Sequence, residues 1–117
     1  MERLLVYHNP ACTQSRKAVD ILRERGLDFE AILYLDRPLA SDDFALILAL
    51  LPNEPAELVR REERFQELGL DEAGYRTPEQ VIGVLLAHPE LMQRPIVIRG
   101  NRAVLARPSE KVLELLD

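Results

Sequence analysis

The chain has 117 residues, which predicts a single domain over residues 1–117, because most domains contain roughly 100–150 residues. With 47% apolar and 30% charged residues, the composition is typical of a globular protein and excludes a disordered or fibrous chain. One cysteine excludes an internal disulfide and a zinc site built on several thiolates, so no metal is expected, and a net charge of −5 argues against nucleic acid as a partner.

The first third of the chain predicts a strand, a helix and a second strand. Leu4 to Tyr7 is a short apolar run typical of a buried strand, and Pro10 ends it. A helix is expected from about Thr13 to Arg25, with Gly26 as its end. Phe29 to Tyr34 reads as a second strand. Since the unit occupies about 30 residues, it predicts a βαβ crossover with two parallel strands.

The middle of the chain is predicted to be helical. Ser41 is the expected N-cap of a helix that runs to about Leu51, where Pro52 ends it. Shorter helices are expected from Pro55 to about Arg61 and from Glu63 to Leu68.

A further helix and the C-terminal elements complete the pattern. Thr77 begins a capping box, and its helix is expected to reach Ala87. Pro95 to Arg99 and Arg102 to Ala106 read as two strands joined by a tight turn at Gly100. A last helix is expected from Glu110 to Leu116.

The element order is therefore β-α-β, a helical insertion, and β-β-α. This order is that of an α/β, thioredoxin-like fold with a mixed central sheet. One shared core is expected for seven apolar residues, namely Val6, Ala18, Val19, Leu22, Ile32, Ile96 and Val97.

The charges are distributed unevenly along the chain. Two windows, Arg3 to Val19 and Leu91 to Ser109, contain no acidic residue and carry +3 and +4, so the rest of the chain carries −12. Thirteen of the fifteen basic residues are arginine, which binds oxyanions through two parallel donors. The first window contains Cys12, so the thiol lies in a locally basic segment.

Cys12 lies at or just before the start of the first predicted helix. Unpaired backbone N–H groups at a helix N-terminus stabilise a thiolate and hold an oxyanion. Ser15 is placed to donate its hydroxyl to the sulfur, and Arg16 adds positive charge. Free cysteine is often only a small buried hydrophobe, but polar residues on both sides argue against that here.

Spacing excludes two common thiol chemistries. A thioredoxin-type site needs a second cysteine where Ser15 stands, and a Cys-x5-Arg phosphatase loop needs arginine where Ala18 stands. What remains is a site with one thiol, which forms a covalent adduct but depends on an external thiol to resolve it.

Residues 8–16 (His-Asn-Pro-Ala-Cys-Thr-Gln-Ser-Arg) resemble the signature of the glutaredoxin-dependent arsenate reductases, the ArsC family. Six further segments agree with that family in order along the chain: Leu33-Tyr34-Leu35, Leu58-Val59-Arg60, Gln66-Glu67-Leu68-Gly69-Leu70, His88-Pro89, Arg94-Pro95-Ile96-Val97 and Arg107-Pro108-Ser109-Glu110. The similarity extends from about residue 4 to residue 116, and the combination is specific although each segment alone is weak.

The resemblance implies a reaction on arsenate. Cys12 would attack arsenate to form a cysteinyl-arsenate adduct, glutathione would displace at arsenic as a co-substrate, and glutaredoxin would reduce the mixed adduct with release of arsenite. No bound cofactor is implied. Arg60, Arg94 and Arg107 would bind the oxyanion, although Arg61 competes with Arg60 for that role.

The resemblance also assigns supporting residues. His8 would help to keep the thiol ionised, although it remains open whether it tunes Cys12 or only caps or packs. Pro95 would be the cis-proline beside the active cysteine. Asn9 and Arg16, from the same polar segment as Cys12, are expected to support the site.

Two other functions stay open. The fold also occurs in Spx-type regulators that bind RNA polymerase, and the missing second cysteine leaves only a redox-independent adaptor of that kind. A glutathione-linked thiol transferase with another substrate is the third hypothesis. Because the longest apolar run, Phe44 to Leu51, is far below the roughly 18 residues of a membrane span, we expect a cytoplasmic protein without a membrane partner. A monomer is the simplest expectation.

Overall fold

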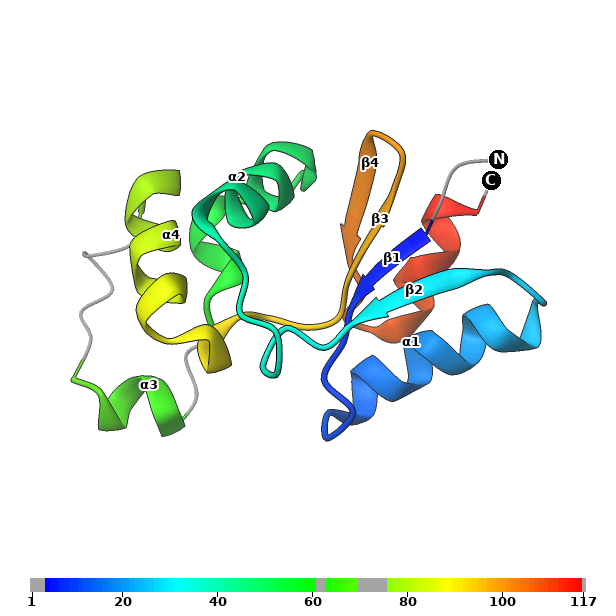
Figure 1. Ribbon diagram of the computed structural model, residues 1–117, viewed down its shortest axis with the longest axis horizontal. Coiled ribbons are helices and arrows are strands. Elements are labelled where there is room, and N and C mark those ends of the chain that lie inside the picture. Colours follow the sequence, from blue (N-terminus) through cyan, green and yellow to red (C-terminus); the bar gives the residue numbers. More distant parts are fainter. Residues whose placement is uncertain (1–3, 61–62, 70–75, 117) are drawn as a thin grey trace.

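The computed structural model describes residues 4–60, 63–69 and 76–116. The elements, in which η denotes a 3-10 helix, follow in the order β1 (Leu4–Tyr7), α1 (Thr13–Glu24), β2 (Phe29–Ile32), α2 (Ser41–Leu50), η1 (Pro55–Leu58), α3 (Glu63–Glu67), α4 (Pro78–Ala87), η3 (Pro89–Leu91), β3 (Ile96–Arg99), β4 (Arg102–Leu105) and η4 (Ser109–Leu115). This order confirms the predicted β-α-β, helical insertion and β-β-α (Figure 1).

The four strands form one mixed sheet in the order β2-β1-β3-β4. The crossover through α1 makes β1 and β2 parallel, whereas β3 is antiparallel to both β1 and β4. The β3–β4 turn has Gly100 at φ +61°, a left-handed conformation that glycine adopts without steric cost. The expected mixed sheet of a thioredoxin-like fold is therefore confirmed.

Helix α1 forms because its buried residues recur at helical spacing. Ser15, Ala18, Val19 and Leu22 are buried and lie on one face, and the following Gly26 has φ +68°. This face packs against the sheet and against η4 (Figure 1). The packing fixes the start of α1, and with it Cys12, at the carboxyl end of β1.

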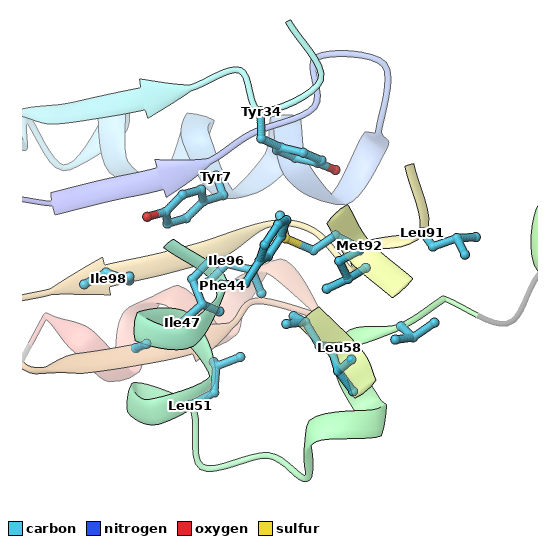
Figure 2. Close-up of a cluster of buried hydrophobic side chains, with 14 of the residues drawn as sticks. Tyr7, Tyr34, Phe44, Ile47, Leu51, Leu58, Leu91, Met92, Ile96 and Ile98 are labelled. Carbon is cyan, nitrogen blue, oxygen red and sulfur yellow. The ribbon is translucent and has the colours of Figure 1, made fainter. Parts of the chain in front are cut away.

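The expectation of one shared core is wrong, because the sheet separates two clusters. Alternate residues of a strand point to opposite faces. Val6 and Val97 therefore pack under α1 and η4 with Ala18, Val19 and Leu22. Ile96 lies on the other face, with Ile32 packed against its cluster, together with residues of the helical insertion such as Phe44 and Met92 (Figure 2).

Several predicted boundaries shift by one to three residues. Strand β2 ends at Ile32 rather than Tyr34, since its partner β1 ends at Tyr7. The N-cap of α2 is Ala40 rather than Ser41, because the Asp43 carboxylate accepts the Ala40 N–H at 2.8 Å. The segment expected as a helix from Pro55 to Arg61 is a 3-10 helix that ends at Leu58.

The C-terminal helix and η3 also differ from expectation. The last segment is a 3-10 helix over Ser109–Leu115, rather than an α-helix from Glu110 to Leu116. Pro89–Leu91 forms a 3-10 turn that the sequence pattern did not predict.

The helical insertion is tied back to the segment that precedes β3. Val59 forms an isolated antiparallel bridge with Met92, and the backbone N–H groups of Arg60 and Gln93 donate to Leu91 and Leu58 at 2.7 Å each. These bonds hold the chain around Arg60 beside the segment that leads to Arg94. None of the helices in the described ranges is long and apolar enough to cross a membrane.

Candidate active site

Cys12 occupies the N-cap position of α1. The loop that precedes it is tied to the sheet, since the His8 N–H donates to the Ile32 carbonyl at 2.9 Å, and the Cys12 N–H donates to the Asn9 carbonyl at 2.9 Å. The residue is extended, with φ −95° and ψ 124°, and its sulfur is partly exposed. The thiol therefore lies at the positive end of the α1 macrodipole.

The surroundings of Cys12 favour its thiolate. Burial by itself raises the pKa of the thiol, but hydrogen bonds from the Ser15 backbone N–H, the Arg94 guanidinium and the Gln14 backbone N–H, together with the Arg94 charge, lower it more. The net pKa lies below the ordinary value of 9.0. A larger fraction of the thiol is therefore ionised and nucleophilic near neutral pH.

Arg107 links the sulfur to the segment before β3. Its Nη1 lies 3.8 Å from Cys12 Sγ and donates to the Arg94 carbonyl at 2.9 Å. The peptide bonds Arg94–Pro95 and Arg107–Pro108 are both cis, which confirms the expectation for Pro95. Two arginines that are far from Cys12 in sequence thus flank its sulfur.

The side chain of Arg94 is only partly satisfied. Its Nη1 donates to the Glu90 carbonyl at 3.1 Å, while its buried Nε has no hydrogen-bond partner among the described residues. A guanidinium beside a thiolate adds a fixed positive charge that favours an incoming anion.

Arg60 lies near the same group, at the end of the insertion. It is half-buried, and its charge and that of Arg94 both act on the pKa of Tyr34. The structure therefore brings Arg60 toward the predicted site. Arg61, its competitor, lies outside the described residues.

The hydroxyl of Ser15 forms hydrogen bonds within the loop before α1 rather than with the sulfur of Cys12. The fully buried Ser15 Oγ lies 2.6 Å from His8 Nδ1 and accepts the Asn9 N–H at 3.1 Å. We expected this hydroxyl to donate to Cys12; instead the backbone N–H of Ser15 stabilises the thiolate. The hydroxyl holds the loop in the shape that places Cys12 at the helix end.

The His8 ring lacks the positive charge that would stabilise a thiolate. Burial lowers its pKa below 6.5, and the nearby charges of Arg23 and Arg16 lower it further. The ring is therefore neutral at pH 7, and its Nδ1 can accept the Ser15 hydroxyl proton. His8 supports the loop by hydrogen bonding, without adding positive charge at Cys12.

The supporting residues shape the loop around Cys12. The Asn9 side chain is buried and accepts the Ala11 N–H at 2.9 Å, as in an Asx turn. Arg16 is exposed and donates to the Pro10 carbonyl at 2.9 Å. Both contacts restrict the loop that presents the thiol.

Two residues at the site were not singled out from the sequence. Gln14 accepts the Ser109 N–H through its Oε1 at 3.1 Å, which fastens α1 to η4. Tyr34 is 1% exposed, and its buried hydroxyl has no hydrogen-bond partner in the described part of the chain. Burial raises the pKa of Tyr34. The charge of Arg94 lowers this pKa, the charge of Cys12 raises it, and the charge of Arg60 lowers it. Both residues lie in segments that resemble the ArsC family, and this resemblance is the signal in the sequence that could have identified them.

The arrangement combines a stabilised thiolate with helix N–H donors and arginine donors. Such a site can bind a tetrahedral oxyanion and attack its central atom, because the donors neutralise the repulsion between two anions. Among the described residues, no three His, Cys, Asp or Glu side chains gather as metal ligands would.

Comparison with known proteins identifies similar chains. The ArsC family model matches residues 7–115. An arsenate reductase from Escherichia coli is 38% identical over 100% of this chain and 83% of its own length. An uncharacterized protein, YfgD, from Escherichia coli (strain K12) is 35% identical over 98% of each chain.

Solved structures agree with this similarity. An arsenate reductase from Vibrio cholerae superposes with a TM-score of 0.85 and 31% sequence identity, covering 97% of each chain. At this level of identity and coverage, the match extends over the whole thioredoxin-like fold, including the segments that surround Cys12.

Proposed function

Since the chain belongs to the ArsC family, we propose that it is an arsenate reductase in which Cys12 is the nucleophile. The observation that carries the proposal is the sulfur of Cys12, whose pKa is lowered and which lies 3.8 Å from Arg107 Nη1. The similarity to curated arsenate reductases supports arsenate as the oxyanion.

Arsenate would bind between the arginines and the start of α1. Arg107 and Arg94 would contact its oxygens, and the backbone N–H groups of Ser15 and Gln14 would contribute two further donors. Arg60 would complete the cluster from the side of the insertion. These donors neutralise the charge of arsenate before the thiolate approaches it, which lowers the barrier to attack.

The first step forms a sulfur–arsenic bond. The Cys12 thiolate attacks arsenic, and one arsenate oxygen leaves as water after it has taken up protons. Arsenic stays pentavalent in this adduct, because the sulfur replaces an oxygen without electron transfer to arsenic.

The second step needs an external thiol, because the chain has one cysteine. Glutathione would displace a second oxygen at arsenic, which leaves as water, so that arsenic stays pentavalent and carries both sulfurs. A glutaredoxin thiolate would then attack the glutathione sulfur and form a disulfide with it, and the electron pair of the broken sulfur–arsenic bond would stay on arsenic and reduce it to the trivalent state. Water would then displace Cys12 from arsenic, releasing arsenite and restoring the thiol.

The cytoplasm is the compartment that would supply this chemistry. Reduced glutathione is maintained there, and a lone thiol such as Cys12 stays reduced. No bound cofactor is needed, since glutathione enters as a co-substrate in each turnover.

The test is NADPH consumption coupled through glutathione reductase, glutathione and glutaredoxin, with arsenate as substrate. We expect turnover with the wild-type protein and none above background with Cys12→Ser, because the serine hydroxyl is not ionised at neutral pH. Arg107→Gln is expected to lower kcat/KM for arsenate by about 100-fold, the size of effect typical of one lost donor to a developing charge.

Arg102→Gln is the matched control, because Arg102 is an exposed arginine of the same basic window and is bonded to the Glu114 carbonyl. It is expected to retain wild-type turnover. Equal rates for wild type and Cys12→Ser would contradict the proposal. Activity on glutathionylated peptides without any response to arsenate would instead favour a thiol transferase.

A further inference from the structure

One tyrosine hydroxyl is buried beside the candidate active site without a partner. Tyr34, which follows β2, is 1% exposed, and its hydroxyl has no hydrogen-bond partner among the described residues. Buried polar groups are nearly always paired, because leaving one unpaired costs stability. An unpaired hydroxyl next to a reactive thiol is therefore a candidate for a contact that forms when a ligand binds.

The hydroxyl of Tyr34 lies near the chain that carries the two arginines. Figure 2 shows the Tyr34 ring in the cluster of buried side chains, with its hydroxyl pointing to the side of Leu91 and Met92, shortly before Arg94. The Arg60 N–H donates to the Leu91 carbonyl at 2.7 Å, which holds Arg60 beside the same segment. Tyr34 is therefore placed where the helical insertion meets the segment before β3.

The charges that act on Tyr34 are those of the proposed oxyanion site. Burial has the largest effect on its pKa and raises it above 10.0, so the hydroxyl keeps its proton at neutral pH. Arg94, Cys12 and Arg60 are all close enough for their charges to act on this hydroxyl. These three residues are partly exposed, whereas the hydroxyl is buried. The hydroxyl thus lies at the inner end of a group whose charged members reach solvent.

A tyrosine hydroxyl adds a property that the other donors of the site lack. Guanidinium and backbone N–H groups only donate hydrogen bonds, whereas a phenolic hydroxyl both donates and accepts. Arsenate at neutral pH has charged oxygens, which accept, and at least one protonated oxygen, which donates. The Tyr34 hydroxyl can pair with either kind of oxygen, so a bound tetrahedral oxyanion would satisfy the group that the free chain leaves unpaired.

We propose that Tyr34 is a substrate-binding residue, whose hydroxyl forms a hydrogen bond with an oxyanion held between Cys12 and the arginines. The inference rests on the proposed function and adds to it a neutral contact from the buried side of the site. The arginines supply charge from the accessible side, and Tyr34 fixes one oxygen from the interior. Loss of the hydroxyl should therefore weaken anion binding without weakening the fold.

The test measures oxyanion binding without turnover. Cys12 is the only cysteine, so alkylation of the thiol by iodoacetamide reports on this site, and bound arsenate should block it. The ratio of the alkylation rates with and without arsenate, followed over arsenate concentration, gives the Kd for each variant. We expect Tyr34→Phe to raise this Kd about tenfold, the effect of one lost hydrogen bond to a charged group.

The coupled reductase assay gives a second readout. The hydrogen bond from Tyr34 would be present both in the bound substrate and in the transition state. Tyr34→Phe should therefore raise KM for arsenate by about the same factor as Kd, with little change in kcat.

Tyr7→Phe is the matched control. Tyr7 is 3% exposed in the same cluster, and its hydroxyl points away from that of Tyr34 in Figure 2. Burial and the charges of Asp43 and Glu30, rather than those of the arginines, act on its pKa. Tyr7→Phe removes the same atom from the same cluster and should keep the wild-type Kd.

The proposal is overturned if Tyr34→Phe keeps the wild-type Kd, or if Tyr7→Phe raises the Kd as much. It is also overturned if the weaker binding of Tyr34→Phe comes with a lower free energy of unfolding in urea, since lost packing would then explain it. Absence of protection by arsenate in the wild type would contradict the proposed function as well. Equal protection of wild type and Tyr34→Phe would contradict this inference alone.

Discussion

At the scale of single residues, the hydroxyl of Tyr34 is buried without a hydrogen-bond partner in the described part of the chain. A buried polar group left unpaired costs about 1–3 kcal/mol of stability. Tyr34→Phe keeps the ring that packs in the cluster of Figure 2 and removes the hydroxyl. We therefore expect the free energy of unfolding to rise by about 1 kcal/mol, measured by urea denaturation. A fall of that size would show that the hydroxyl is bonded.

Cys12 is expected to make stability depend on pH. Its pKa in the folded chain lies below the ordinary 9.0, so between these two values the unfolded chain binds more protons, and the free energy of unfolding rises with pH. This contribution is complete above 9.0 and is lost as pH falls through the folded pKa. Cys12→Ala should remove it, so the stability difference between wild type and variant should grow across that window in urea titrations. A difference that is constant with pH would contradict the lowered pKa.

The position of Cys12 could be predicted from the sequence, whereas the hydrogen-bond partner of the Ser15 hydroxyl could not. The pattern of strand, proline and helix predicted that Cys12 stands at a helix start, because that position depends only on local order. The partner of the Ser15 hydroxyl was not predictable in this way. The rotamer of Ser15 depends on which neighbouring groups compete for its hydroxyl. In the folded loop, the hydroxyl forms hydrogen bonds with His8 Nδ1 and the Asn9 N–H.

At the scale of elements, the N-terminus of α4 is held by its capping box. The Gln80 N–H donates to Thr77 Oγ1 at 3.2 Å, and Gln80 Oε1 accepts the Thr77 N–H at 3.1 Å. Thr77→Ala is expected to lower the free energy of unfolding by about 1 kcal/mol. Ser41→Ala is the contrasting variant, because Ala40 rather than Ser41 is the N-cap of α2 and its effect should be close to zero. Equal losses for both variants in urea denaturation would show that Ser41 stabilises α2 as much as Thr77 stabilises α4.

The same comparison explains which element boundaries were predictable. Thr77 was identified correctly because serine or threonine followed three residues later by glutamine is a local signature. The cap of α2 was misplaced by one residue, since the side chain that satisfies the Ala40 N–H comes from Asp43 inside the helix. The end of β2 depended on the length of its partner β1, which no local pattern reports.

At the scale of the whole molecule, the sheet lies between two apolar clusters that share its strands. Because β1 and β3 contribute to both, we propose that residues 1–117 form one domain that unfolds in a single transition. Tyrosine fluorescence reports on one cluster through Tyr7 and Tyr34, whereas Val97 lies in the other.

Val97→Ala tests this coupling. It should destabilise the chain by about 2 kcal/mol, through lost burial and a small cavity. The loss should appear equally in tyrosine fluorescence and in far-ultraviolet circular dichroism during denaturation. A shift in circular dichroism without a shift in fluorescence would show that the two clusters unfold separately.

The contact between Arg107 and Cys12 joins residues that are 95 positions apart. During synthesis, the N-terminal part of the chain leaves the ribosome long before Arg107 does. Until the later segment has been made and has packed against α1, Cys12 lacks this partner and the nearby charge of Arg94, and it behaves more like an ordinary, mostly protonated thiol. We therefore expect the thiol of an incomplete chain to react more slowly with oxidants than the thiol of the folded chain.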